Sequence, residues 1–262
     1  MITEAFLHFK GIGPKNIHKI KEAGFNSWDD IIRNSADLPF GEKLNNSILE
    51  EARKYISLLE DNNIIKLTNS FHPSDKWRVL YRFFHKASFF DIETNPYNWH
   101  NPITVITCFH RGKIFKYVRG KNLEEFIDLT QEIELLVSFN GISFDVPIIL
   151  NHYHIPALPC AHIDLRWIAY HNGHKGGLKS IERKLNIKRP NDLEGVDGMM
   201  AVALWDNWER KKDTKSLDLL VRYCSADSLS LYLLGIEILK EKNIIIKDTL
   251  SDGAVWNILD NS

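Results

Sequence analysis

Four acidic side chains, set in three separate motifs, are the residues of this chain best suited to carry chemistry. Asp91 and Glu93 follow an apolar run in SFFDIET, Asp145 follows an Asn-Gly turn in SFNGISFDVP, and Asp227 lies in YCSADS. If folding brings them together, two such charges about 4 Å apart repel by roughly 4 kcal/mol even at an effective dielectric constant near 20. Hard divalent cations prefer oxygen ligands and would relieve this repulsion. The four acids therefore predict a metal site, of the kind that serves two-metal phosphoryl chemistry on nucleic acid.

The Asp-x-Glu pattern is weak evidence by itself, because the chain contains it twice. Asp91 and Glu93 directly follow apolar residues, whereas Asp192 and Glu194 lie in RPNDLEGVDG, which is rich in turn-forming residues. We interpret the second pair as a turn. In a strand, residues i and i+2 face the same side, so both carboxylates of the first pair can address one ion. A strand edge with solvated acids is the alternative for this pair.

The other two motifs also have structural alternatives. Asp145 precedes Pro147, which is tolerated early in a helix, so an ordinary helix N-cap is one alternative for this aspartate. Tyr223 and Asp227 are four residues apart in LDLLVRYCSADSLSLYLLG, and this spacing places them on one helix face. None of the other tyrosines has an acidic residue four positions on. A structural tyrosine and a surface aspartate form the alternative for this motif.

Alternating strands and helices are expected to position these motifs. A buried strand should end near Asp91, and a hairpin should follow around an Arg-Gly-Lys turn. The strand is predicted within the stretch 77–94, and the hairpin, helix and fourth strand at 103–118, 122–130 and 133–139. A helix is expected to open near Asp145, and the remainder to about residue 242 should be mostly helical. This order is that of a ribonuclease H-like α/β fold, in which a mixed β-sheet is flanked by helices.

The composition of the chain suggests two folded regions. The first residues contain amphipathic helix patterns without a strand signal, while residues 66–76 are polar and form the best candidate for a linker. We expect a small all-α region at 1–65, a linker at 66–76, the α/β domain at 77–243 and a C-terminal tail at 244–262.

Taken together and in this order, the three motifs resemble those of the DEDD superfamily of exonucleases. Asp-x-Glu, Asn-x3-Phe-Asp and Tyr-x3-Asp match its tyrosine branch, and Arg222 stands where the histidine branch carries its histidine. The stretches GGLKSIERKLNIKR (176–189) and DGMMAVALWDNW (197–208) further resemble YprB-like ribonuclease H-like proteins of bacteria and archaea. The resemblance covers about residues 85–240.

This resemblance implies a two-metal 3′–5′ exonuclease that hydrolyses phosphodiester bonds. The four acids would hold two Mg²⁺ or Mn²⁺ ions, and Tyr223 would orient the attacking water. Thr94, Asn140 and Phe144 would belong to the nucleic-acid-binding part of the site. Within it, Phe144 would pack against the terminal base, and Asn140 would fix the turn that aims the third acid. A core position is the alternative for Phe144.

The segment HFKGIGPKNIHKIKEAG (8–24) resembles the hairpin of helix-hairpin-helix proteins. Gly11 and Gly13 would let the backbone bend so that its amides face a phosphate at a helix N-terminus. Lys15 would add positive charge. A Gly-x-Gly turn between two structural helices is the alternative.

Composition places limits on the remaining possibilities. The chain has 262 residues and a formal net charge of −1, so it is not a polycation that coats nucleic acid. Its three cysteines, Cys108, Cys160 and Cys224, are far apart, and their apolar neighbours favour buried thiols over disulfides or zinc ligands. We see neither a signal-peptide pattern nor an apolar run of about 18 residues. A cytoplasmic protein without a membrane partner is expected.

Two other groups of polar residues have ordinary interpretations. The first group contains His162, Asp164, His171 and His174. Because their spacing matches no zinc pattern, we interpret them as ordinary strand-end and surface residues. The second group is basic and contains Lys175, Lys179, Arg183 and Lys184. We interpret it as a solvated helix face, although these side chains could also guide a nucleic-acid strand toward the site.

The function expected from these features is hydrolysis of single-stranded DNA from its 3′ end. An RNA-processing exonuclease of the same fold is one alternative, since the motifs contain no sensor of the 2′-hydroxyl group. A non-catalytic nucleic-acid-binding module is the other. A costly acidic cluster has no use in such a module, which favours the enzyme.

Overall fold

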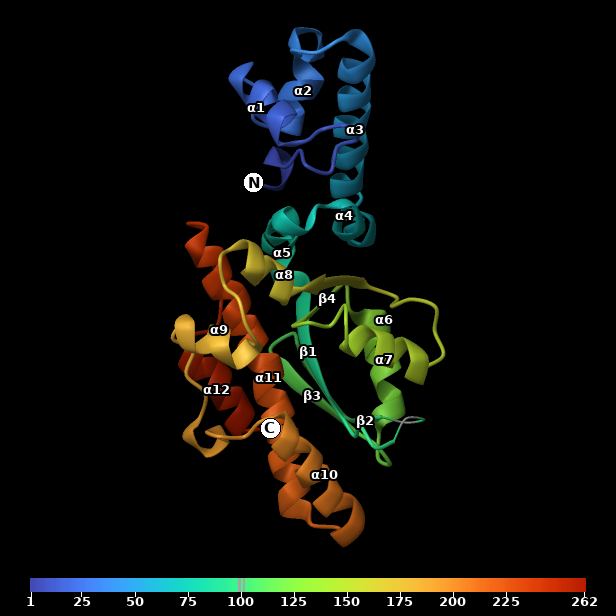
Figure 1. Ribbon diagram of the computed structural model, residues 1–262, viewed down its shortest axis with the longest axis vertical. Helices are drawn as coiled ribbons and strands as arrows, with labels where there is room; N and C mark the ends of the chain where they lie inside the picture. Colours follow the sequence, from blue (N-terminus) through green and yellow to red (C-terminus); the bar gives the residue numbers. More distant parts are fainter. Residues whose placement is uncertain (99, 101) are drawn as a thin grey trace. The chain divides into compact units, whose positions relative to one another are not determined.

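The computed structural model describes residues 1–98, 100 and 102–262. The chain separates into two compact units, Met1–Phe83 and Phe84–Ser262 (Figure 1). The boundary lies after the segment expected to be a linker, residues 66–76. That segment is largely helical and belongs to the first unit, because its apolar side chains, such as the buried Leu67 and Phe71, pack there.

The first unit is built from helices around an aromatic core. Its α-helices are α1 (Pro14–Glu22), α2 (Trp28–Arg33), α3 (Glu42–Glu60), α4 (Ile64–Ser70) and α5 (Lys76–Arg82). Ser27 caps α2 and forms a reciprocal capping box with Asp30. Trp28 and Tyr55 are buried and contact the ring of His8, for which burial lowers the pKa to about 3. His8 is therefore a neutral core residue.

The second unit contains a mixed five-stranded sheet, which confirms the predicted ribonuclease H-like α/β fold. Its strands are β1 (Ala87–Thr94), β2 (Ile103–His110), β3 (Lys113–Val118), β4 (Leu135–Ser138) and β5 (Ala161–Asp164), in the order β3-β2-β1-β4-β5. The first three strands are antiparallel, while β4 runs parallel to β1, and β5 parallel to β4. Strand β5 lies in the part expected to be mostly helical. Its four residues are too few to show a strand period.

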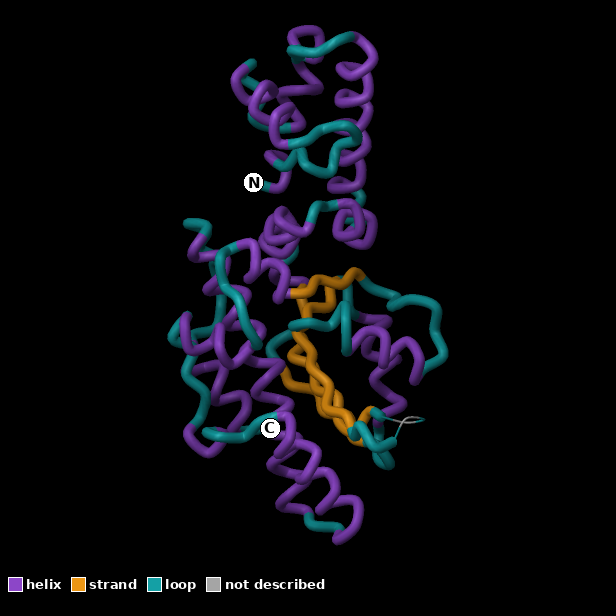
Figure 2. The backbone as a smooth tube through the Cα atoms, in the orientation of Figure 1, coloured by secondary structure: helices purple, strands orange, loops and turns teal. Residues whose placement is uncertain are grey.

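Helices cover both faces of this sheet (Figures 1 and 2). They are α6 (Phe126–Glu132), α7 (Asp145–His152), α8 (Leu165–His171), α9 (Leu178–Lys184), α10 (Gly198–Lys211), α11 (Thr214–Glu241) and α12 (Asp252–Asp260). Phe126 of α6 and Ile149 of α7 share a buried apolar cluster with Phe90 of β1. On the other face, α11 packs against β1 and β2, and α10 and α12 pack against α11. Helix α12 occupies the predicted tail.

The alternation along β1 decides where its acids point. Phe90 and Ile92 enter the apolar cluster shared with α6 and α7, whereas Phe89 contacts Tyr232 of α11. Asp91 and Glu93 therefore lie on the α11 side, because odd and even residues of a strand face opposite ways. The strand continues to Thr94, beyond its predicted end at Asp91. A register shift between Glu93 and Thr94 marks an irregularity of the kind that re-aims side chains beside functional sites.

Helix α11 is the central helix of this unit. Its length and mean hydropathy of 1.2 would suit a membrane span, but 78% of that apolar window is buried within the protein, as in a core helix. Small residues let it approach the sheet closely. Thr107 of β2 shares a 2.7 Å hydrogen bond with the Ser228 hydroxyl and donates to the Cys224 carbonyl oxygen at 2.9 Å. These bonds fix α11 beside Asp91, which pairs with Thr107 in the sheet.

Candidate active site

A single cavity of about 380 Å³ collects the predicted catalytic residues from three elements. Strand β1 contributes two acids, the start of α7 one, and α11 an acid and a tyrosine. The predicted residues that line it are Asp91, Glu93, Asn140, Phe144, Asp145, Tyr223 and Asp227. Motifs separated by more than a hundred positions in the sequence thus meet at one place.

The carboxylates in this cavity are held in positions that disfavour their charge. Asp145 is 4% exposed and Asp227 is 6% exposed. Burial raises the pKa of Asp91 well above its usual value, and the neighbouring charges of Asp227, Glu93 and Asp145 raise it further. The pKa of Asp145 rises to about 7, chiefly through burial. Because protons or cations must offset such a cluster, its chemistry fits hard divalent ions.

Arg189 already supplies one positive charge to this cluster. Its guanidinium forms an ion pair with Asp227 and hydrogen-bonds both carboxylate oxygens of Glu182, at 2.9 and 2.5 Å. The Ser230 hydroxyl donates to Glu182 at 2.5 Å and completes this buried network. Both residues lie in the stretch 176–189 that resembles YprB-like proteins, but the sequence assigns neither of them a role. Their role as partners of Asp227 becomes visible only after α9 and the segment following it pack against α11.

Tyr223 is held by Lys179, which also lines the cavity. The Lys179 ammonium donates to the Tyr223 hydroxyl oxygen at 2.8 Å and lies 4.3 Å from the centre of its ring. Burial and the Asp227 charge raise the pKa of Tyr223 far above its ordinary value, so the hydroxyl keeps its proton. Since Lys179 occupies one acceptor position, that proton is available to a water in the cavity. From the sequence, we interpret Lys179 as part of a solvated basic helix face, so its contact with Tyr223 is not predicted.

Asp164 fixes the turn that leads to Asp145. Its carboxylate accepts hydrogen bonds from the main-chain amides of Asn140 at 2.7 Å and Ile142 at 3.1 Å. Asn140 has a φ of 67°, and its side-chain oxygen accepts from Arg166. At the next residue, Gly141, a Cβ atom would lie 2.0 Å from the Ser138 hydroxyl oxygen. Asp164 thus has a structural role beyond the ordinary strand end that we expected.

The structural alternatives for the motif residues do not match their positions. Phe144 is the N-cap of α7, and Asp145 is the first helical residue after it, without a side-chain capping bond. Phe144 is 43% exposed at the cavity, so it is not a core residue. Asp227 is buried and not a surface aspartate.

The remaining predicted residues lie elsewhere. Thr94 ends β1 and is not among the residues that line the cavity. Gly11, Gly13 and Lys15 belong to the first unit. Gly11 has a φ of 78°, Gly13 is the N-cap of α1, and Lys15 is exposed. The backbone thus bends at Gly11 as expected, and the structure leaves their contact with nucleic acid a prediction.

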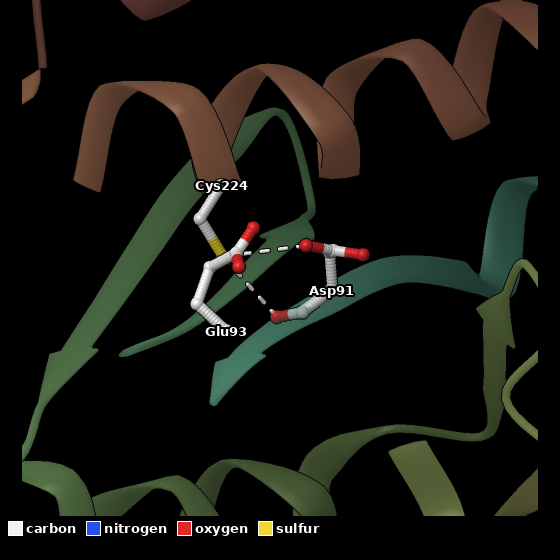
Figure 3. A group of neighbouring side chains, drawn as sticks. All are labelled: Asp91, Glu93 and Cys224. Carbon is white, nitrogen blue, oxygen red and sulfur yellow. Dashed lines mark hydrogen bonds between the residues drawn. The ribbon is translucent and has the colours of Figure 1, made fainter. Parts of the chain in front are cut away.

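Cys224 adds a thiol to the edge of the acidic cluster. Figure 3 shows Cys224 of α11 directed toward Asp91 and Glu93 of β1. One donor atom from each of these three residues lies within 4.8 Å of the others. All three cysteines are free and buried, as expected, but Cys224 differs from the other two because the motif residues next to it in sequence bring its thiol to the carboxylates.

The sheet order and the carboxylate-lined cavity together define an RNase H-like α/β domain. Residues 88–238 match the sequence profile of the RNase H superfamily, which is more than half of the chain. The protein belongs to the RNase H superfamily. This membership supports nuclease activity in general, with nucleic acid as substrate, and RNase H-like nucleases generally use divalent metal ions.

A comparison with solved structures finds a similarity to the family B DNA polymerase from the hyperthermophilic archaeon Pyrobaculum calidifontis. The sequences are 15% identical, the TM-score is 0.48, and the match covers 59% of this chain. It spans 24% of the polymerase chain, about a quarter of its length. A search of curated proteins found no match.

Proposed function

We propose that this protein is a two-metal-ion exonuclease that shortens single-stranded DNA from its 3′ end. The observation that carries the proposal is the convergence of four acids and Tyr223 on one cavity in a domain of the RNase H superfamily. The order of the three motifs, which resembles that of the tyrosine branch of the DEDD exonucleases, supports the polarity. Exposed Phe144 at the cavity offers an apolar ring to an unpaired terminal base.

Asp91, Glu93, Asp145 and Asp227 would hold two Mg²⁺ or Mn²⁺ ions. When bound, such ions supply a water of lowered pKa as nucleophile and stabilise negative charge on the departing oxygen. Arg189 holds the Asp227 carboxylate by an ion pair while the rest of its guanidinium binds Glu182. This leaves the Asp227 side chain oriented before any ion arrives, which reduces the cost of assembling the site.

Tyr223 positions the attacking water in this proposal. Its protonated hydroxyl accepts a hydrogen bond from Lys179 and lines the cavity, so its own hydrogen can be donated to a water there. Because its pKa is raised far above the working range, Tyr223 orients the water and does not remove a proton from it. Gly11, Gly13 and Lys15 would contribute a phosphate contact in the first unit, at the start of α1.

Degradation of end-labelled single strands tests this function. Purified protein is incubated with 5′-labelled DNA and RNA of the same sequence, in Mg²⁺, in Mn²⁺ and in EDTA. The proposal predicts a ladder of DNA products shortened from the 3′ end, which EDTA abolishes. A 3′-labelled strand should release labelled mononucleotide from the outset.

Other outcomes distinguish the alternatives. Faster loss of the RNA strand would replace the DNA assignment with an RNA-processing exonuclease. Internal cuts would contradict the exonuclease assignment. Binding of the oligonucleotide without degradation in any metal would overturn catalysis and favour a nucleic-acid-binding module.

A further inference from the structure

The three cysteines of this chain fall into two environments. Cys108 and Cys160 belong to the apolar cluster between the sheet and α6 and α7. Cys224 lies on the opposite side of the sheet, where its sulfur is 3.3 Å from the Thr107 hydroxyl and 3.5 Å from an Asp91 carboxylate oxygen. A thiol among carboxylates and hydroxyls is not explained by apolar packing. Cys224 therefore has a chemical setting that the other two cysteines lack.

The spacing around Cys224 suits direct metal ligation. Tetrahedral zinc with a sulfur ligand at about 2.3 Å and an oxygen ligand at about 2.1 Å separates those two ligand atoms by about 3.6 Å. The distance from Cys224 Sγ to Asp91 Oδ2 is 3.5 Å. A Glu93 carboxylate oxygen completes the group within 4.8 Å. These three atoms could surround one ion with little movement of α11 or β1.

The Glu93 carboxylate is available for such an ion. No hydrogen bond or ion pair engages it among the described residues, and both it and Asp91 line the cavity through which an ion would enter. A divalent cation would satisfy both carboxylates at once.

We propose that Cys224, Asp91 and Glu93 form a binding site for a thiophilic divalent ion such as Zn²⁺ or Cd²⁺. The metal–sulfur bond replaces the S–H bond, and the proton leaves to solvent. Mg²⁺ prefers oxygen ligands and leaves the sulfur as a thiol, whereas Zn²⁺ and Cd²⁺ accept sulfur. The inference rests on the proposed function in one respect, that Asp91 and Glu93 bind divalent ions.

This site gives the cavity two metal states with different consequences. A hard ion leaves Asp91 and Glu93 arranged with Asp145 and Asp227 for hydrolysis. A thiophilic ion held by Cys224 would instead occupy the same two carboxylates, Asp91 and Glu93. Zn²⁺ should therefore compete with Mg²⁺ and inhibit the proposed nuclease.

Cadmium titration followed by ultraviolet absorption tests the site without relying on cleavage. Metal-free wild-type protein should develop a thiolate-to-cadmium charge-transfer band that saturates at one ion per chain. Cys224→Ser replaces sulfur by oxygen at similar size and should abolish the band. Cys160→Ser alters a buried thiol in the apolar cluster and should retain it. Circular dichroism establishes that each variant is folded, and Cys224→Ala provides a second variant if the serine variant does not fold.

Calorimetry supplies the quantitative measurement. The ratio of Zn²⁺ affinity to Mn²⁺ affinity should fall by about 10-fold or more in Cys224→Ser, because loss of even a residue that only orients a metal ligand costs about 10- to 100-fold in metal affinity. Cys160→Ser should keep the wild-type ratio. An unchanged ratio in Cys224→Ser, or a band that persists in it, would overturn the proposal.

The result also separates this inference from the proposed function. Mn²⁺ binding without a cadmium band in wild type would reject the thiol ligand and leave the nuclease proposal standing. A saturating cadmium band in a protein that degrades no nucleic acid would support the thiol ligand and reject the nuclease proposal. Absence of both band and Mn²⁺ binding would reject both.

Discussion

Two Asp-x-Glu pairs with identical spacing occupy opposite environments in this protein. Asp91 and Glu93 lie within β1 and line the acidic cavity. Asp192 lies in a short 3-10 helix, where its carboxylate is half exposed and binds Arg222 through both oxygens at 2.5 and 3.2 Å. Glu194 follows it and is exposed. The turn predicted for this second pair is confirmed.

The difference between the pairs is electrostatic as well as structural. Burial and neighbouring carboxylates raise the pKa of Asp91, whereas the hydrogen bond from Arg222 lowers the pKa of Asp192. Asp91 is thus surrounded by other carboxylates without a cation as partner in the described part of the chain, while Asp192 is already paired with Arg222. The same short motif can therefore be a candidate metal ligand or a surface ion pair, and the elements around it decide which.

The largest expected effect is a loss of nuclease activity when Glu93, but not Glu194, is replaced. Glu93→Gln removes a charge from the cavity and should reduce nuclease activity by about 10⁴-fold, which corresponds to about 5.4 kcal/mol of activation free energy. Glu194→Gln makes the same chemical change at an exposed turn and should leave the rate within about twofold of wild type. Initial rates on labelled single strands in Mg²⁺ measure both. Equal losses in the two variants would contradict the distinction.

The two arginines that bind aspartates provide a comparison of stability. Arg189→Met leaves the buried carboxylates of Asp227 and Glu182 without their partner, and breaking such a buried pair costs about 3–5 kcal/mol. Arg222→Met breaks pairs with the half-exposed Asp192 and Asp260 and should cost about 1 kcal/mol or less. Urea unfolding of the metal-free proteins measures the difference. A larger loss for Arg222→Met would mean that the Arg189 network is not the buried support described.

The stability of the metal-free protein should fall as pH rises. The pKa of Asp145 is about 7 in the folded protein and about 3.9 in an unfolded chain, so the folded state binds more protons between these values. Stability is then lost on going from about pH 4 to pH 7, by about 1.4 kcal/mol for each unit of pKa difference realised. Urea unfolding in EDTA at several pH values measures this slope.

Two variants sharpen this pH prediction. Asp145→Asn should flatten the slope and stabilise the metal-free protein near pH 8. Asp192 has a lowered pKa, so its smaller contribution is present at neutral pH and lost in acid, and Asp192→Asn should leave the slope between pH 4 and 7 unchanged. A metal-free protein that becomes more stable from pH 4 to 7 would contradict the picture of crowded carboxylates.

The smallest effect concerns the hydroxyl that positions water. Tyr223→Phe should lower kcat by about 10- to 100-fold, or about 1.4–2.7 kcal/mol, with little change in KM. Tyr232 lies on the same helix, and its hydroxyl accepts a 2.9 Å hydrogen bond from the Leu250 amide. Tyr232→Phe is thus a matched control and should keep the wild-type kcat. A loss of kcat in the control alone would show that the hydroxyl of Tyr223 has no positioning role.

Much of the fold could be predicted from the chain, because its signals are local. The β-branched alternation of residues 103–118 specifies the hairpin, and the period of residues 214–241 specifies α11. Strand β5 escaped prediction because four residues carry no readable period. The unit boundary after Phe83 also escaped, because a polar stretch can be helical when its few apolar residues are buried.

The residues of the candidate active site and their partners divide in the same way. Asp91, Glu93, Asp145, Tyr223 and Asp227 belong to ordered motifs, and the sequence could single them out. Lys179, Arg189 and Asp164 act through contacts across long sequence separations, such as the hydrogen bond from Lys179 to Tyr223. No local pattern encodes such contacts, since they depend on how α9, β5 and α11 pack.

Counting the Mn²⁺ ions that each glutamate variant binds shows whether the acidic cavity is the metal site. Calorimetric titration of the metal-free proteins at pH 8 should give two ions per chain for wild type and for Glu194→Gln, and fewer than two for Glu93→Gln. Such a result would identify the acidic cavity as the metal site and the second pair as a surface turn. Failure of the wild type to bind Mn²⁺, or the same stoichiometry in both variants, would show that Glu93 and the acidic cavity do not form the metal site.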